Sequence, residues 1–303
     1  MHSTISKLIA ARPVVADGAW GTSGPVISDG AWGTQLQIRG MPLGSTPDAW
    51  NLVQPEKVEE VARAYVEAGS QVILTNTFGA NRFILGRHGM GDKVAEVNRI
   101  GVEISKRAAD GKAMVFASIG PSGIMLLMGD VSTDELQAAF AQQAQAQAAA
   151  GADGIVIETM SDLTEAKLAL AAALETGLPV VASMTFDSGA KLDRTMMGVT
   201  PEQAAEQLTS AGADVIGANC GRGIADYAPI CARLHAATDR PIWIKANAGL
   251  PKMVDGKTVY TQTPDEFASF VPQIVQSGAA FVGGCCGTTP EFIKAIRAKL
   301  SGN

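Results

Sequence analysis

The sequence predicts an α/β protein built as a single (β/α)8 (TIM) barrel. Short runs rich in Val and Ile alternate with helical runs along all 303 residues. The short runs are apolar nearly throughout, which is typical of strands buried on both faces of a parallel sheet. Eight such strands alternate with eight helices, and no G-x-G-x-x-G follows the first strand. These features favour a closed barrel over an open doubly wound sheet, so we expect residues 1–303 to form one barrel domain.

The expected strands and helices alternate in order along the chain. The strands are Pro25–Asp29, Gln71–Thr75, Ala113–Ile119, Gly154–Glu158, Pro179–Thr185, Val215–Asn219, Pro241–Ala246 and Phe281–Gly284. The helices are Lys57–Ala68, Val94–Asp110, Asp134–Ala150, Leu163–Thr176, Pro201–Ala211, Tyr227–Thr238, Pro264–Ser277 and Pro290–Leu300. Glycine directly follows six of these helices, which favours a left-handed C-terminal cap. Pro201, Pro264 and Pro290 suit a first helical turn, and the threonine before each is a candidate N-cap.

The N-terminal region contains a short tandem repeat. Pro13–Thr22 reads PVVADGAWGT and Pro25–Thr34 reads PVISDGAWGT, with eight of ten positions identical. Repeat architectures need several copies, so we interpret this as a local duplication of the first strand and its turn. Only one copy can occupy the first strand of the barrel. The second copy leads directly into QLQIRG, so we expect it, with Asp29 rather than Asp17, to form that strand.

The composition excludes several classes of protein. Hydrophobic residues make up 47% of the chain and charged residues 18%, which argues against disorder. The net charge of −6 argues against sequence-independent binding of nucleic acid. No segment approaches the roughly 20 apolar residues that span a bilayer. The first residues also lack the pattern of a signal peptide. We therefore expect a cytoplasmic protein that binds neither nucleic acid nor a membrane.

Three of the four cysteines are candidate metal ligands. Cys220 follows the sixth expected strand, and Cys285 and Cys286 follow the eighth. Active sites of these barrels lie at the C-terminal ends of the strands, and only one strand separates these two ends. Three thiolates can then converge on one Zn²⁺ at about 2.3 Å, and the fourth position stays open as in a catalytic zinc site.

Ordinary burial is the alternative explanation for each cysteine. We adopt it for Cys231, which lies within an expected helix. For the other three, the flanking glycines at strand ends are hard to explain by packing. A Cys285–Cys286 disulfide would join adjacent residues and would be strained.

Six motifs together resemble the homocysteine S-methyltransferase family. They are DGAWGTQLQIRG, LTNTFGANR, ETMSD, GANCG, NAGLP and GGCCGTTPE, and they extend from about Pro13 to Ala298. In particular, they resemble the homocysteine-binding domain of cobalamin-dependent methionine synthase. GGCCG with an upstream NCG is the most specific of these signals. The resemblance implies zinc-dependent transfer of a methyl group to the thiol of homocysteine, which gives methionine.

The resemblance also implies roles for individual residues. The zinc ligands of the family match Cys220, Cys285 and Cys286. The asparagine of the NAG motif, here Asn247, can occupy the zinc when substrate is absent. The residue type alone leaves open that Asn247 only hydrogen-bonds a loop backbone.

The homocysteine site of the family matches Glu158 and the segment Asp29-Gly30-Ala31. Glu158 corresponds to the residue that binds the substrate amino group, and an acid at the end of the fourth strand suits an ammonium ion. The backbone amides and the acid of Asp29-Gly30-Ala31 correspond to groups that face the amino acid. The residue type alone leaves open that Asp29 only braces its turn.

The methyl donor remains open at this point. No cobalamin-binding or folate-binding domain follows, so methylcobalamin would come from a separate corrinoid protein. Alternatively, the indole of Trp32 stacks on a small onium donor, or it simply packs under the first loop. Two other functions also stay open, namely methylation of a different thiol and metal binding without turnover.

Overall fold

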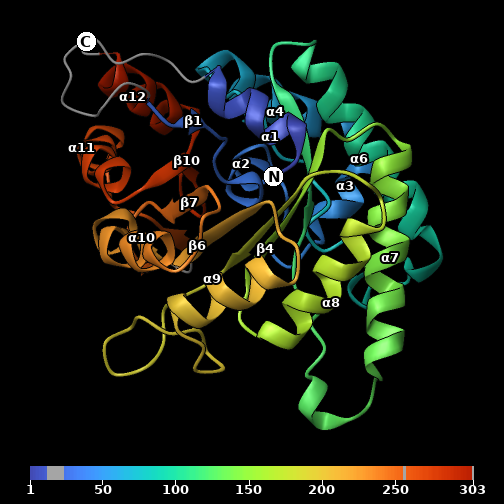
Figure 1. Cartoon of the computed structure of the whole chain (residues 1–303). Helices are drawn as coiled ribbons and strands as arrows, with labels where there is room; N and C mark the ends of the chain where they lie inside the picture. Colours follow the sequence, from blue (N-terminus) through green and yellow to red (C-terminus); the bar gives the residue numbers. More distant parts are fainter. Residues whose placement is uncertain (12–23, 255–256, 302–303) are drawn as a thin grey trace.

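Eight parallel strands close into a barrel with helices around the outside (Figure 1). The computed structural model describes residues 1–11, 24–254 and 257–301. The barrel strands are β1 (Val26–Ile27), β2 (Val72–Ile73), β3 (Met114–Ile119), β4 (Gly154–Met160), β5 (Val180–Met184), β6 (Val215–Gly223), β7 (Ile242–Asn247) and β10 (Ala279–Gly284). Each strand pairs with the next, and β10 pairs with β1. A parallel bridge between Ser28 and Val72 joins β1 to β2 and closes the ring, which confirms the predicted fold class.

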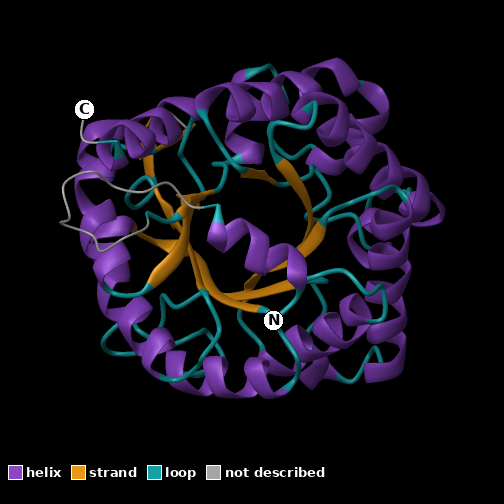
Figure 2. Ribbon diagram, turned by 45° about the horizontal axis from the view of Figure 1, so that its top comes forward, coloured by secondary structure: helices purple, strands orange, loops and turns teal. Residues whose placement is uncertain are grey.

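The barrel helices form an outer ring that covers the sheet (Figures 1 and 2). They are α4 (Pro55–Ala68), α6 (Val94–Ala109), α7 (Thr133–Ala149), α8 (Leu163–Leu174), α9 (Pro201–Ser210), α10 (Tyr227–Ala236), α11 (Pro264–Gln276) and α12 (Pro290–Leu300). Loops add the shorter helices α2 (Trp32–Ile38), α3 (Trp50–Val53) and α5 (Arg82–Arg87), and the hairpin strands β8 (Lys252–Val254) and β9 (Lys257–Val259). Within the described ranges, no helix is long and apolar enough to cross a membrane.

The ends of the barrel helices follow the predicted caps with one exception. All six glycines expected after helices have positive φ angles between 72° and 105°. Thr200 and Thr263 each form a capping box with the side chain three residues on. Thr289 makes no such cap, because its hydroxyl instead donates to Glu291 Oε2 at 2.5 Å. Thr289 thus occupies the predicted N-cap position, but its side chain makes no capping hydrogen bond.

The second copy of the repeat supplies the first strand of the barrel. Val26 and Ile27 pair with Phe281 and Val282 of β10, as the sequence predicts. The first copy, including Asp17, lies outside the described residues.

An N-terminal helix that the sequence interpretation missed closes the bottom of the barrel. Helix α1 (Ser3–Ala10) crosses the middle of the ring of strands in Figure 2. Its buried residues Ile5 and Leu8 join a cluster with the first inward-facing residues of the strands, including Trp243 and Phe281. The backbone N–H of His2 donates to Asp214 Oδ1 at 2.7 Å. Because this end is filled, the accessible end of the barrel is the one where the strands terminate.

Candidate active site and metal centre

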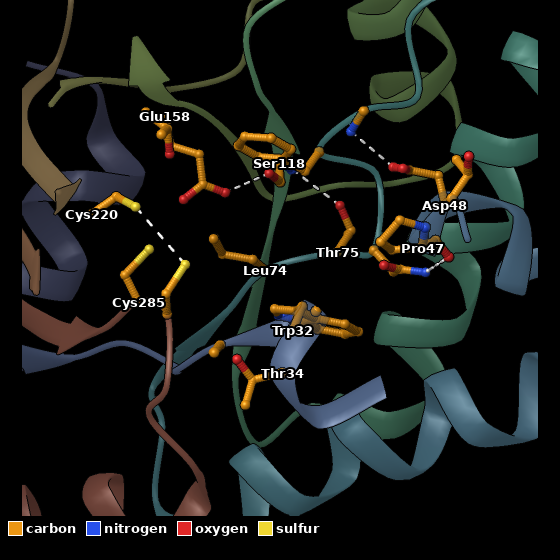
Figure 3. A pocket seen from close by; sticks show the side chains of 18 of the residues that line it. Trp32, Thr34, Pro47, Asp48, Leu74, Thr75, Ser118, Glu158, Cys220 and Cys285 are labelled. Carbon is orange, nitrogen blue, oxygen red and sulfur yellow. Dashed lines mark hydrogen bonds between the residues drawn. The ribbon is translucent and has the colours of Figure 1, made fainter. Parts of the chain in front are cut away.

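A cavity of about 450 Å³ opens at the C-terminal ends of the strands. In the view of Figure 3, Cys220, Cys285 and Glu158 lie on one side, Pro47 and Asp48 on the other, and Trp32 and Leu74 between them. These side chains come from many elements, including β4, β6 and the turn after β10. The cavity therefore depends on closure of the whole barrel.

The three predicted cysteines converge at one end of this cavity. The Sγ atoms of Cys220 and Cys286 are 3.9 Å apart, and all three sulfurs lie within 4.8 Å of one another. Tetrahedral Zn–S bonds of about 2.3 Å place sulfurs roughly 3.8 Å apart, so the set fits a zinc ion with small adjustment. All three side chains are partly exposed, so the cluster is accessible from the cavity. Cys231 is fully buried away from this cluster, as predicted.

Without a cation, the three thiols share protons unequally. Hydrogen bonds from Cys285 and Cys286 lower the pKa of the Cys220 thiol. The hydrogen bonds to Cys220 in turn raise the pKa of Cys285 and of Cys286. One thiolate held by two thiols is the resulting arrangement. A divalent cation is what allows all three to ionise together, which matches the chemistry of a thiolate zinc site.

Contacts of the Thr288 side chain explain why glycine is needed at Gly284, before Cys285, and at Gly30. Thr288 Oγ1 donates to the Cys285 carbonyl at 2.7 Å and accepts from the Ala31 N–H at 3.1 Å. A Cβ on Gly284 would collide with the Thr288 side chain, and one on Gly30 would lie 2.7 Å from Thr288 Oγ1. The GGCCGT and DGA motifs therefore form one packed unit that joins the ends of β10 and β1.

The backbone is irregular where Glu158 and Cys220 enter the cavity. Thr159 and Cys220 both have φ of +63°, a left-handed conformation that is costly for residues other than glycine. Asn219 Oδ1 accepts from the Thr159 N–H at 2.8 Å, and Asn219 Nδ2 donates to Thr159 Oγ1 at 2.7 Å. Ser183 Oγ also donates to Asn219 Oδ1 at 2.7 Å. The Asn219 side chain thus fixes β4 and β6 together, and both strands continue beyond their predicted ends.

Glu158 faces the cavity with one oxygen engaged. Its side chain is 7% exposed, and Ser118 Oγ donates to Oε1 at 2.5 Å. Burial raises the pKa of Glu158, while the charge of Lys245 and the hydrogen bond from Ser118 oppose the rise. An ammonium group placed beside this carboxylate would stabilise its ionised form.

Asp29, in contrast, has both carboxylate oxygens engaged. Lys245 Nζ donates to Oδ1 at 2.5 Å. Trp32 Nε1 and the Leu74 N–H donate to Oδ2 at 2.8 and 2.7 Å. Asp29 is fully buried, so it braces the first turn and fixes the Trp32 indole at the cavity wall.

Asn247 lies at the end of β7, beside the cysteines. Its side chain is 4% exposed, and a hydrogen bond from it contributes to the low pKa of Cys220. Within the described residues, its buried Oδ1 atom has no hydrogen-bond partner. An unpartnered amide oxygen at this place is a suitable additional donor for a cation held by the cysteines.

Comparison with known proteins identifies the family. A family model described as "Homocysteine S-methyltransferase" matches residues 26–300. The chain belongs to the homocysteine S-methyltransferase family. Its cysteine cluster lies at the C-terminal ends of β6 and β10.

Individual members of this family show what the chain resembles. It is 30% identical to methionine synthase of Mycobacterium leprae and to that of Mycobacterium tuberculosis, over 97% of its own length. It spans only 25% of the length of each of these relatives. The homocysteine methyltransferase MmuM of Escherichia coli, in its metallated form, superimposes with a TM-score of 0.76 at 23% identity. That match covers 91% of this chain and 96% of MmuM, and it concerns the fold.

The sequence interpretation of this family member missed three residues of the site. They are Ser118, which holds Glu158, Asn219, which links the strands, and Lys245, which pairs with Asp29. Lys245 carried a usable signal, because a single lysine interrupts the otherwise apolar run of β7. Asn219 was part of a recognised motif, but its side chain gave no indication of its partners.

Proposed function

We propose that this chain transfers a methyl group to the thiol of homocysteine in a zinc-dependent reaction that gives methionine. The observation that carries the proposal is the convergence of three cysteine sulfurs within 4.8 Å at one end of the cavity that Glu158 also lines. Cys220, Cys285 and Cys286 would hold the ion, with Asn247 beside it when substrate is absent. We further propose that residues 1–303 act as one barrel domain.

Zinc, when bound, would favour deprotonation of a coordinating substrate thiol at neutral pH. The residues of the chain then orient the substrate. Glu158 binds the ammonium group, and the backbone of Gly30 and Ala31 lies beside the amino acid. Asp29 contributes indirectly, since its oxygens are already occupied by Lys245, Trp32 and Leu74.

The transfer itself is a displacement at the methyl carbon. The sulfur of homocysteine forms a bond to this carbon while the bond between the carbon and the donor breaks. The donor keeps the electron pair of the broken bond, and the thiol proton has already left to solvent. Alignment of sulfur, carbon and leaving group is the main contribution of the cavity.

Two classes of methyl donor are supported by different observations. The likeness to methionine synthases favours methylcobalamin, carried by a corrinoid-binding protein or domain, as the donor. The position of the Trp32 indole, held by Asp29 on the cavity wall, favours a small onium donor through a cation–π contact. A corrinoid exceeds the cavity and would approach its mouth, whereas an onium donor would enter it.

A donor panel tests the proposal. Zinc-loaded protein and homocysteine are incubated with methylcobalamin, S-methylmethionine, dimethylsulfoniopropionate or glycine betaine, and methionine is measured. Turnover with methylcobalamin alone, undiminished in Trp32→Leu, would exclude the onium donors. If no donor yields methionine, the same panel with other thiols tests methylation of a different thiol. Zinc binding without any turnover would indicate a non-catalytic barrel.

A further inference from the structure

Lys245 is a buried cation in the lining of the cavity. Its side chain is 2% exposed, and its Nζ donates to Asp29 Oδ1 at 2.5 Å. Among the described residues that line the cavity, Lys245 is the only lysine or arginine. A lysine is rarely this buried unless it is paired, and one that also lines a binding cavity calls for a functional explanation.

Asp29 uses only part of the hydrogen-bonding capacity of Lys245. A lysine ammonium carries three N–H donors. In the part of the chain that the structure describes, Asp29 Oδ1 is the one hydrogen-bond acceptor that Lys245 Nζ contacts. Asp29 also receives hydrogen bonds from Trp32, Leu74 and Ser28, so its charge is shared among four donors. Lys245 therefore keeps N–H donors for a second acceptor.

The other charged groups nearby define what that anion would be. Glu158 and Cys285 both interact electrostatically with Lys245. Glu158 comes from β4 and Lys245 from β7, with two strands between them in the ring. Next to the cysteine cluster, the cavity lining thus carries one basic side chain, Lys245, and one acidic side chain, Glu158, while Asp29 pairs with Lys245 without lining the cavity. Such a pair of opposite charges complements the zwitterionic head of an α-amino acid whose side chain ends in a thiol.

We propose that Lys245 is a specificity-determining residue that binds the α-carboxylate of the substrate while Glu158 binds its α-ammonium group. This inference rests on the proposed function, because it assumes a thiol amino acid whose sulfur lies at the cysteines. A thiol that lacks either charged group leaves one side chain of the pair without its partner in a buried site. The site would then discriminate against that thiol more strongly than against a change in apolar size.

Three thiols distinguish the contact of Lys245 with the carboxylate from the contact of Glu158 with the ammonium group. They are homocysteine, 4-mercaptobutanoate, which lacks the amino group, and 3-aminopropane-1-thiol, which lacks the carboxylate. Their affinities for the zinc-loaded full chain are measured by calorimetry without a methyl donor, so the identity of the donor does not matter. Lys245→Met should weaken the binding of homocysteine and of 4-mercaptobutanoate by about tenfold or more. It should change the affinity for 3-aminopropane-1-thiol by less than about twofold. Glu158→Gln should show the opposite selectivity.

Two further variants control for structural effects. Lys106→Met removes a lysine from another Lys–Asp pair, 2.9 Å from Asp153 and outside the cavity, and should leave all three affinities unchanged. Lys245→Met leaves Asp29 as an unpaired buried charge and can impair folding. Lys245→Met combined with Asp29→Asn removes both charges, and compared with Asp29→Asn alone it should show the same loss of carboxylate selectivity.

The outcomes distinguish this inference from the proposed function. A wild-type protein that binds none of the three thiols would overturn the proposed function and the assignment of Lys245 with it. If the wild-type protein prefers homocysteine but the Lys245 variants lower the affinity for all three thiols equally, only the assignment of Lys245 is overturned. The same conclusion holds if the Lys245 variants leave the carboxylate-bearing thiols unaffected.

Discussion

Replacing Glu158 with glutamine removes one negative charge from the cavity with almost no change in side-chain shape. Glu158 is 7% exposed, and in the described residues its hydrogen bond runs from Ser118 Oγ to Oε1 at 2.5 Å. The second oxygen is then the one that the substrate ammonium would contact. Glutamine keeps an oxygen for Ser118, so the expected loss comes from the contact with the ammonium group.

The size of this loss follows from the type of contact. A hydrogen bond to a charged group contributes about 1.5–3 kcal/mol. Since about 1.4 kcal/mol equals a factor of ten, the dissociation constant for homocysteine should rise about ten- to hundredfold. Burial raises the pKa of Glu158, so in wild type the affinity should fall with decreasing pH sooner than for an exposed glutamate. Glu158→Gln should lose this component of the pH dependence.

Calorimetric titration with homocysteine at several pH values measures both effects, and metal analysis checks that zinc is retained. Glu165 provides a matched control, because it is also a buried glutamate that accepts from a serine, Ser122, at 2.5 Å. It does not line the cavity, so Glu165→Gln should change stability and leave homocysteine affinity unchanged. Unchanged affinity in Glu158→Gln, or an equal loss in Glu165→Gln, would refute the assignment of Glu158.

Three other changes test the metal centre, the repeat and a buried acid. Cys285→Ala should abolish zinc binding and activity together, whereas Cys231→Ala should retain the metal. Metal analysis measures the zinc content, and full zinc occupancy in Cys285→Ala would contradict the ligand set. Asp29→Asn should lower activity severely and Asp17→Asn only mildly, because the second repeat forms β1; activity assays showing the reverse order would contradict this. Burial raises the pKa of Asp48 from 3.8 to about 6, so its stabilising contribution is present below pH 3.8 and is lost as the pH rises through about 6. Asp48→Asn should therefore raise the free energy of unfolding near pH 8 by up to roughly 3 kcal/mol, and denaturant titration should show this gain shrinking toward pH 4.

The barrel could be predicted because buried parallel strands leave a strong apolar signal. Its details depend on contacts that are distant in sequence. The strand predicted over Pro25–Asp29 pairs regularly only at Val26 and Ile27, and the side chain of Asp29 is drawn into contacts with Lys245 and Leu74. Helix α1 is only eight residues long, and such short helices need tertiary packing. Its packing surface exists only once the barrel has closed.

The candidate site was predictable where residue type carries the chemistry. Three cysteines near two strand ends pointed to a metal centre without any knowledge of side-chain positions. The left-handed backbone at Thr159 and Cys220 could not be foreseen, because residues other than glycine rarely adopt it. Asn219 stabilises this backbone through contacts across strands, and such contacts leave no local pattern in the sequence.

Asp29 and Glu158 show why partners decide the roles of two similar acids. Both are acids expected at the ends of strands, and both belong to motifs of the family. Both carboxylate oxygens of Asp29 accept hydrogen bonds, from Lys245, Trp32 and Leu74. Glu158 accepts a hydrogen bond from Ser118 on one oxygen. A carboxylate that is already saturated has little to gain from a substrate ammonium, while a partly satisfied one gains a charge-assisted hydrogen bond. Substitution of Asp29 should therefore disturb the shape of the cavity, and substitution of Glu158 should remove a substrate contact.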